Sequence, residues 1–215
     1  MKHLVIIPTW NAEKHLERCI LSLKKHGVSI FGIDNCSTDG TQDIFKKHDV
    51  WFFSQNDHGT SEAINSAVRL THADVYSIIG ADDEWIASPQ PIVDFFSKND
   101  NEWAYSPLNF ADQFMMGTRL YTLEEMTKGN KIPGVSMFFK RDLLLREPWD
   151  EKIKYANDYE YTMRLMSKGI MPGFIDVCMV KYNLTGRNDG LSQKSIEEAE
   201  NLKKKYADIC SNNRL

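Results

Sequence analysis

The chain has 215 residues, of which 42% are hydrophobic and 26% charged; these ordinary proportions exclude wholesale disorder. Lys and Arg number 26 against 30 Asp and Glu, and the resulting net charge of −4 gives no sequence-independent attraction for nucleic acid. The longest uninterrupted aliphatic run, Leu4 to Ile7, is far shorter than the roughly 20 residues that span a membrane.

The first hundred residues alternate between strand-like and helix-like segments. Apolar runs without polar alternation predict buried strands at 4–7, 30–33, 50–53 and 75–80. Apolar residues at helical spacing predict helices at 12–26, 41–48 and 61–70. This alternation predicts an α/β fold with a central, mostly parallel sheet flanked by helices.

The regular alternation of strands and helices ends after residue 84. Further strands are predicted at 103–106, 135–139 and 174–182, and further helices at 88–97, 157–168 and about 196–209. The stretch from about Phe110 to Pro133 has no readable periodicity. Because no repeat, low-complexity run or Gly/Ser linker divides the chain, we expect one two-part domain over residues 1–215, with its halves meeting near residue 100.

The cysteines indicate a reducing compartment. The four cysteines show neither a close pair nor a metal-finger spacing, which favours free thiols. The apolar run that starts at Leu4 is closed by Pro8 and has no extended signal-peptide core. We therefore expect a cytoplasmic protein that associates at most peripherally with the inner face of the membrane.

Polar loops follow four of the predicted strands. Ligands of open α/β sheets bind at the carboxyl ends of the strands, where such loops leave the core. Each loop alone is compatible with an ordinary turn, because Asp and Asn are common turn residues. Together they predict a ligand site at one rim, made from residues 8–11, 34–40, 55–59 and 80–84.

The acidic triplet Asp82-Asp83-Glu84 is the sharpest of these signals. Neighbouring side chains at a strand end point to opposite sides, so one carboxylate can face a metal while the next reaches a ribose hydroxyl. Mg²⁺ and Mn²⁺ prefer oxygen ligands and can neutralise a diphosphate leaving group. An exposed acidic turn that caps the next helix is the alternative interpretation.

Four strings in the first half resemble glycosyltransferase family 2: IPTWNAEKHLERCILSL, IDNCSTDGT, NDHGTSEAIN and IIGADDEW. The resemblance implies the GT-A fold and a nucleotide-diphosphate-sugar donor. Three residues depart from the family's usual pattern. Asn35 and Cys36 replace an Asp and a Gly in the second string, and Glu62 replaces an Asp in the third.

The resemblance continues in the second half. GVSMFFKRDLL resembles the acceptor-side strand of the family, and YANDYEYTMRLMSKG its helix with the catalytic base. Asp158 is thereby implied to be the general base, although a helix-capping role is the alternative. The stretch from Tyr182 to Ser192 resembles a loop that commonly closes such domains.

The resemblance also implies the roles of individual rim residues. Asp83 is implied to hold a divalent metal, Mn²⁺ or Mg²⁺, and Asp82 to lie on the ribose side. The residues expected to bind the nucleotide are Pro8, Thr9, Asn11, Asp34, Asn35, Asp57, Gly59, Asn65 and Asp82. Of the tryptophans, Trp85 directly follows the acids and is the first candidate for a sugar-stacking platform.

These expectations combine into a function. We expect an inverting glycosyltransferase that moves a sugar from a nucleotide-diphosphate sugar to a glycan or lipid-linked acceptor. UDP-sugars are the expected donors. About residues 1–100 would bind the nucleotide sugar and about residues 101–215 the acceptor. Two alternatives stay open. One is a catalytically idle nucleotide-binding member of the same fold, and the other is a sugar-nucleotide pyrophosphorylase, although residues 8–11 contain no glycine for a phosphate loop.

Overall fold

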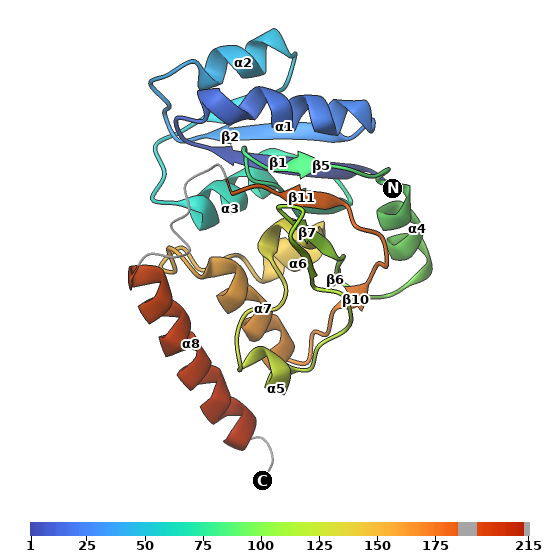
Figure 1. Cartoon of the computed structure of the whole chain (residues 1–215), viewed down its shortest axis with the longest axis vertical. Coiled ribbons are helices and arrows are strands. Elements are labelled where there is room, and N and C mark those ends of the chain that lie inside the picture. Colours follow the sequence, from blue (N-terminus) through green and yellow to red (C-terminus); the bar gives the residue numbers. More distant parts are fainter. Residues whose placement is uncertain (185–192, 213–215) are drawn as a thin grey trace.

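A computed structural model describes residues 1–184 and 193–212 of the chain (Figure 1). Its first half alternates strands and helices as the apolar pattern predicts. The elements are β1 (His3–Thr9), α1 (Glu13–Lys25), β2 (Ser29–Asp34), α2 (Thr41–Lys47), β3 (Phe52–Ser54), α3 (Thr60–Leu70) and β4 (Val75–Ile78). β1 pairs in parallel with both β2 and β4, and β2 pairs in parallel with β3, which confirms the parallel sheet.

The second half builds onto this sheet and adds another. Its elements are β5 (Glu84–Trp85), α4 (Gln90–Lys98), β6 (Trp103–Tyr105), β7 (Leu108–Phe110), β8 (Phe114–Met116), α5 (Leu123–Met126), a 3₁₀ turn (Gly134–Ser136), β9 (Met137–Lys140), α6 (Arg141–Arg146), α7 (Asn157–Ser167), β10 (Gly173–Phe174), β11 (Val180–Tyr182) and α8 (Gln193–Asn212). The larger sheet has the order β10-β6-β9-β4-β1-β2-β3, and the smaller sheet has the order β5-β11-β7-β8.

Two details differ from the sequence prediction. The predicted strand at 174–182 is two short strands in different sheets, since β10 pairs with β6 and β11 with β7. The stretch from Phe110 to Pro133 contains the β7–β8 hairpin and the short helix α5. Strands far apart in the chain pair in β10–β6 and β11–β7, and local periodicity does not indicate such partners.

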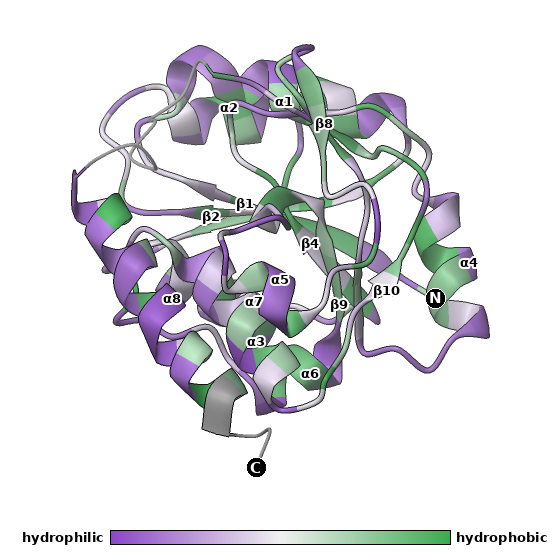
Figure 2. Cartoon of the chain, turned by 60° about the horizontal axis from the view of Figure 1, so that its bottom comes forward, coloured by the Kyte–Doolittle hydropathy of each residue, from purple (hydrophilic) through white to green (hydrophobic). Residues whose placement is uncertain are grey.

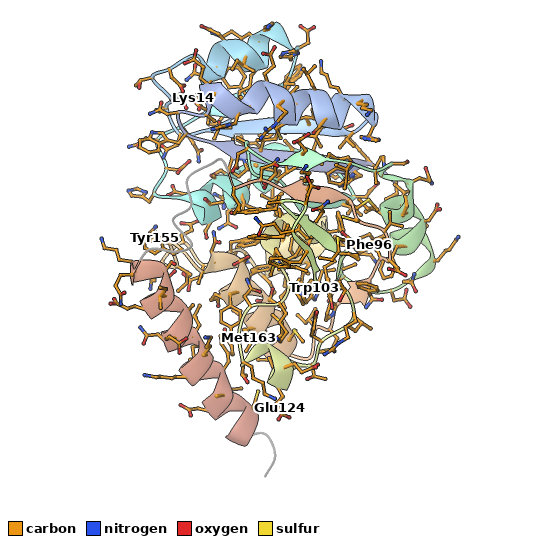
Figure 3. The ribbon with its side chains drawn as sticks, in the orientation of Figure 1. Lys14, Phe96, Trp103, Glu124, Tyr155 and Met163 are labelled. Atoms are coloured by element: carbon orange, nitrogen blue, oxygen red, sulfur yellow. The ribbon has the colours of Figure 1, made fainter. Side chains whose placement is uncertain are left out.

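Hydrophobic clusters pack on both faces of the large sheet. Alternate residues of β1 point to opposite faces, so Leu4 and Ile6 join one cluster while Val5 and Ile7 join the other. The buried side of α1 covers the second face, and α3 with α7 covers the first. Trp103 lies fully buried in the middle of the molecule (Figure 3).

The last helix packs along α7. Leu202 and Tyr206 of α8 are buried in the first cluster, and the Tyr206 hydroxyl donates to Glu160 Oε1 at 3.2 Å. Its other side is polar, as the hydropathy colours show (Figure 2). Within residues 1–184 and 193–212, no helix is both long and apolar enough to cross a membrane.

Candidate functional site

A cavity of about 480 Å³ opens at the carboxyl ends of β1, β2 and β4, where the polar loops were predicted to meet. The segment before α7 and the start of α3 close its other side. Its wall consists of Pro8, Thr9, Trp10, Asn11, Ala12, His15, Asn35, Asp57, Gly59, Thr60, Ala63, Gly80, Ala81, Asp82, Lys154, Tyr155 and Asn157. Seven of the predicted site residues are on this wall: Pro8, Thr9, Asn11, Asn35, Asp57, Gly59 and Asp82.

The loop after β1 is fixed by side-chain hydrogen bonds to the loop after β2. Ser37 Oγ accepts from the backbone N–H of Asn11 at 2.8 Å, and Asn11 Oδ1 accepts from the N–H of Thr38 at 2.9 Å. Asn11 has a φ of 49°, a left-handed conformation that Asn tolerates. The loop presents the Trp10 side chain, which is 54% exposed, at the cavity wall.

Asp34 is buried and does not line the cavity. Its carboxylate accepts hydrogen bonds from Thr9 Oγ1, Ser37 N, Gln42 Nε2 and Ser54 Oγ at 3.2, 3.1, 2.8 and 2.9 Å. A buried carboxylate with this many donors is satisfied within the protein. Asp34 therefore shapes the rim by anchoring its loops, and the structure does not bring it to the wall as the sequence predicts.

Asn35 and Asp57 connect the second and third rim loops on the wall of the cavity. The N–H of Asp57 donates to Asn35 Oδ1 at 3.0 Å, and Asp57 Oδ1 accepts from the N–H of Gly59 at 3.0 Å. Burial raises the pKa of the Asp57 carboxyl. Glu62 bonds to the neighbouring residue His58, whose backbone N–H donates to Glu62 Oε2 at 2.9 Å, and its negative charge also raises the pKa of Asp57.

Asn65 is also buried and absent from the cavity wall. Its Nδ2 donates to the Trp149 carbonyl at 2.9 Å and to Glu151 Oε1 at 3.0 Å, and its Oδ1 accepts from the N–H of Trp149 at 3.0 Å. This residue joins α3 to the segment before α7. The hydrogen-bonding groups of Asn65 are thus used to hold these two segments together.

The acids after β4 differ in their surroundings. They lie in a tight turn in which the N–H of Asp83 donates to the Gly80 carbonyl at 3.1 Å. Asp82 lines the cavity, whereas Asp83 is 1% exposed and is absent from the wall. Asp83 Oδ1 accepts from the N–H of Asn183 at 2.9 Å. Burial, followed by the negative charge of Asp82, raises the pKa of Asp83 to about 8.

Gly80 allows the two acids to fold back over the end of β4. A Cβ atom at this position would lie 2.8 Å from Asp83 Oδ2 and 2.9 Å from Asp82 Oδ1, so a larger residue would force both carboxylates to move. The backbone of the turn is held from outside, because the Asp82 carbonyl accepts from Arg18 at 2.6 Å and from Asn183 Nδ2 at 3.0 Å.

The chemistry of these acids fits a divalent cation, although the described residues contain no cluster of three or more His, Cys, Asp or Glu that could hold one. Mg²⁺ in proteins is commonly held by one or two carboxylates, with waters and substrate phosphates completing its coordination. Asp82 and Asp83 supply such a pair beside a cavity. The remaining ligands would then come from a bound diphosphate.

Asp158 lies in the first turn of α7, next to the wall residue Asn157. Its Oδ2 accepts from the N–H of Gly134 at 3.0 Å and from Asn130 Nδ2 at 3.2 Å. A Cβ at Gly134 would lie 2.9 Å from Asp158 Cβ, so this approach requires glycine. Burial raises the pKa of the Asp158 carboxyl.

Tyr182 of β11 lies close enough to Asp158 and to the acids after β4 to be affected by the charges of all of them. Burial raises the pKa of its phenol, and the negative charges of Asp83, Asp82 and Asp158 raise it further. The turn after β4 and the first turn of α7 therefore bring their carboxylates close to the same side chain. Asp158 and Asp83 are both near the cavity without being part of its wall.

The sequence prediction missed the segment before α7. Lys154, Tyr155 and Asn157 line the cavity, and Lys154 Nζ donates to the His58 carbonyl across it at 2.8 Å. Glu198 of α8 positions this segment, since its Oε2 accepts from the N–H of Tyr155 at 2.7 Å. Figure 3 shows Tyr155 beside the start of α8. No spacing signal marks Lys154 in advance; only the fold brings it to the rim.

Burial decides which tryptophans could stack on a sugar. Trp85 is 1% exposed, and its Nε1 donates to the Ala87 carbonyl at 2.5 Å, so the prediction of a sugar-stacking role for Trp85 is wrong. Trp103 and Trp149 are buried in the first cluster. The predicted closing loop lies largely outside the described residues, which omit 185–192.

Comparison with known proteins identifies the family. The model of the family described as "Glycosyl transferase family 2" matches residues 4–147, about two thirds of the chain. The chain belongs to glycosyl transferase family 2. Among curated relatives of this family-2 chain, chondroitin synthase of Escherichia coli is 26% identical over 219 residues, an alignment that covers 93% of the chain and 31% of the synthase.

Solved structures show the same fold. Staphylococcus aureus TarS 1–349 in complex with UDP-GlcNAc aligns over 96% of the family-2 chain and 66% of its own length, with 18% identity and a TM-score of 0.74. Glucosyl-3-phosphoglycerate synthase of Mycobacterium tuberculosis, in complex with Mn²⁺, UDP and glucosyl-3-phosphoglycerate, aligns over 97% and 78%, with 16% identity and a TM-score of 0.65.

These likenesses settle the fold of the protein. The family-2 chain has the GT-A fold, as the rim motifs imply. The chain spans less than a third of the E. coli synthase and just under two thirds of the TarS chain.

Proposed function

We propose that this chain is an inverting glycosyltransferase that takes a sugar from a nucleotide-diphosphate sugar, with UDP-sugars first among the donors, and passes it to a glycan or lipid-linked acceptor. The observation that carries this proposal is one cavity whose wall combines Asp82, the Asn35–Asp57 pair and Asn157, the last at the start of the helix that bears Asp158. The cavity has the volume of a small-molecule site.

The donor would bind along the rim loops. The exposed aromatic surface of Trp10 is suited to a planar base, and the second hydrogen of the Asn35 amide nitrogen, beside the one donated to Asp57, can donate to the nucleoside. Lys154 is a cation on the wall, and it favours a diphosphate in a chain whose net charge is −4. Thr9, Asn11 and Gly59 complete the nucleotide contacts in this proposal.

A divalent metal, Mn²⁺ or Mg²⁺, would be held by the acidic pair. The sequence assigns the metal to Asp83 and the ribose to Asp82; the cavity wall favours Asp82 as the carboxylate nearer the diphosphate, with Asp83 behind it. When bound, the cation neutralises charge on the leaving diphosphate, a contribution of several kcal/mol. Asp82 and Asp83 would bind and orient it.

Asp158 is the proposed general base. Its carboxylate removes the proton of an acceptor hydroxyl while that oxygen attacks the anomeric carbon, and the bond from this carbon to the nucleotide diphosphate breaks. Attack opposite the leaving group inverts the anomeric configuration. The hydrogen bonds from Gly134 and Asn130 fix the orientation of the carboxylate and leave acceptor capacity on its oxygens.

A thermal-shift screen of nucleotide-diphosphate sugars, with and without Mn²⁺, tests this function. A donor that binds the native state raises the unfolding temperature, and we expect the largest rise for a UDP-sugar with Mn²⁺. Transfer to a panel of glycan and lipid-linked acceptors is then measured with that donor. If no nucleotide sugar raises the unfolding temperature under either condition, the proposed donor class is wrong. Binding without any transfer would instead support the idle-member alternative.

A further inference from the structure

The smaller sheet has an apolar face that continues beyond the core. One residue from each of its strands forms a buried row in register: Trp85 of β5 pairs with Val180 of β11, which pairs with Leu108 of β7, and Leu108 pairs with Met116 of β8. These side chains belong to, or pack against, the cluster on the second face of the large sheet. The row forms the inner part of the face.

A second row on the same face is aromatic. Tyr182, Phe110 and Phe114 each lie two residues from a member of the first row, so they point to the same side of the sheet. Tyr182 pairs with Phe110, and Phe110 pairs with Phe114. The ring centroids are 5.2 Å apart in the first pair and 4.8 Å apart in the second, with interplanar angles of 15° and 19°.

This aromatic row begins at the acids and ends in solvent. Asp83, at its inner end, accepts a hydrogen bond from Asn183, the residue after Tyr182. Phe114, at its outer end, is 53% exposed. β11 and β7 lie side by side in Figure 1, and β8 is coloured as hydrophobic in Figure 2. Three aligned rings that lead outward from a reaction centre have the character of a binding surface.

We propose that Phe114, at the outer end of the Tyr182–Phe110–Phe114 stack, is a platform on which a sugar ring of a glycan acceptor stacks. This inference rests on the proposed function and names the acceptor as an oligosaccharide. The three rings stack on one another, so the ring face left for a ligand is the outer face of Phe114, on the edge strand β8. The carbon–hydrogen faces of a pyranose ring are flat and apolar, and this aromatic face matches them. The stack spans two strand spacings, roughly 10 Å, so a sugar on Phe114 lies beyond the unit that reacts.

A glycan suits this row better than a membrane surface does. Lys181, the basic residue on β11 beside Tyr182, forms an ion pair with Asp112, and Arg119 pairs with Glu125. Both of these cations are paired within the protein, whereas attraction to anionic lipid requires basic side chains that are available to the headgroups. The three residues of the aromatic row are themselves uncharged.

Binding of defined oligosaccharides tests the platform directly. The probes are the tetrasaccharides of chitin, cellulose, hyaluronan and chondroitin. Each is compared with its constituent monosaccharides in the presence of UDP and Mn²⁺. We expect at least one tetrasaccharide to bind more tightly than its monosaccharides. Phe114→Ala should weaken that affinity about tenfold by removing an exposed stacking surface, and Phe114→Tyr, which keeps the ring, should restore it.

The matched control is Trp51→Ala, since Trp51 is an 85% exposed aromatic next to β3, at the other edge of the large sheet. We expect this variant to bind the tetrasaccharide like the wild type. The proposal is overturned if no tetrasaccharide binds better than its monosaccharides, or if Phe114→Ala binds it normally. It is also overturned if Phe114→Ala lowers sedimentation with phosphatidylglycerol vesicles while oligosaccharide binding is unchanged.

UDP affinity, measured in the same samples, separates this inference from the proposed function. Wild-type protein that binds UDP with Mn²⁺ but ignores every tetrasaccharide would refute the platform and leave the donor site standing. Wild-type protein that binds a tetrasaccharide through Phe114 but binds no nucleotide sugar would refute the proposed function and leave the platform.

Discussion

Asn35 and Asp57 are joined by two hydrogen bonds that run in opposite directions. Asn35 Oδ1 accepts from the N–H of Asp57 at 3.0 Å, and Asn35 Nδ2 donates to the Asp57 carbonyl at 3.3 Å. Only a side chain with both a donor and an acceptor can do this, and a carboxylate has no donor. The departure from the family's usual Asp at this position thus has a structural reason, because the amide closes the contact between two rim loops.

We predict that Asn35→Asp, although it restores the residue usual in the family, destabilises this protein. The new carboxylate would lose the bond to the Asp57 carbonyl and place its charge next to the Asp57 side chain, at a cost of about 1 kcal/mol or more. Urea unfolding measures the effect. Asn35→Ala, which removes both bonds without adding charge, is the control and should be no less stable than Asn35→Asp. Wild-type stability of Asn35→Asp would contradict the explanation.

The acidic pair yields a second prediction. Asp82→Asn should lower the affinity for UDP in the presence of Mn²⁺ by about tenfold or more, and leave the affinity measured in EDTA nearly unchanged, because Asp82 is the carboxylate on the cavity wall. Asp83→Asn should have a smaller effect, since its amide oxygen can still accept from Asn183. Titration calorimetry measures both variants. A larger loss of UDP affinity with Mn²⁺ in Asp83→Asn than in Asp82→Asn would instead assign the metal to Asp83.

Local patterns predicted most of the first half. The apolar runs of β1 and β4 and the helical spacing in α1 and α3 are written in consecutive residues, so their elements and the parallel sheet follow from sequence. The β7–β8 hairpin could not be predicted in this way. Its first strand, β7, pairs with β11, about 70 residues later, and such a partner leaves no mark on local periodicity.

The sequence predicts where the candidate site lies better than it predicts which side chains line it. The four rim loops do converge, and seven of their predicted residues line the cavity. Asp34 and Asn65 have the residue types of ligand contacts, yet each is satisfied by protein partners. Those of Asn65 lie 84 and 86 residues away. Whether a polar side chain faces a ligand or a distant backbone group depends on tertiary contacts that its neighbours in sequence do not reveal.

The proposed base gives a third prediction. Asp158→Asn should lower the transfer rate by about 10²- to 10⁴-fold while UDP binding stays near normal, because an amide cannot take the proton of the acceptor. The amide oxygen can still accept from Gly134, whereas the bond that Oδ1 accepts from the N–H of Tyr159 is lost, so the unfolding temperature of the variant is measured alongside. Single-turnover transfer and UDP titration measure the two effects. Asp142→Asn, an exposed acid in the first turn of α6, is the control. Near-normal transfer by Asp158→Asn would reduce Asp158 to a helix-capping residue.

His3 provides a pH-dependent prediction outside the site. It is buried against Trp85 and Phe138, its Nε2 is 2.9 Å from Ser77 Oγ, and burial lowers its pKa to about 4. Between about pH 6.5 and 4 the unfolded chain therefore binds a proton that the folded chain excludes. Stability contributed by neutral His3 is complete above this range and is lost as the pH falls, by about 2 kcal/mol at pH 5.

His3→Gln should remove this loss. The free energy of unfolding, measured at pH 7 and pH 5 by urea titration, should fall by about 2 kcal/mol more in the wild type than in the variant. The raised pKa values of Asp57, Asp83 and Asp158 act in the opposite direction, because those carboxyls favour the folded state when protonated. They are common to both proteins and cancel in the comparison. His72→Gln, at an exposed position, should behave like the wild type. An identical pH dependence in His3→Gln would mean that His3 takes up its proton as readily in the folded chain as in the unfolded chain, so that burial does not lower its pKa.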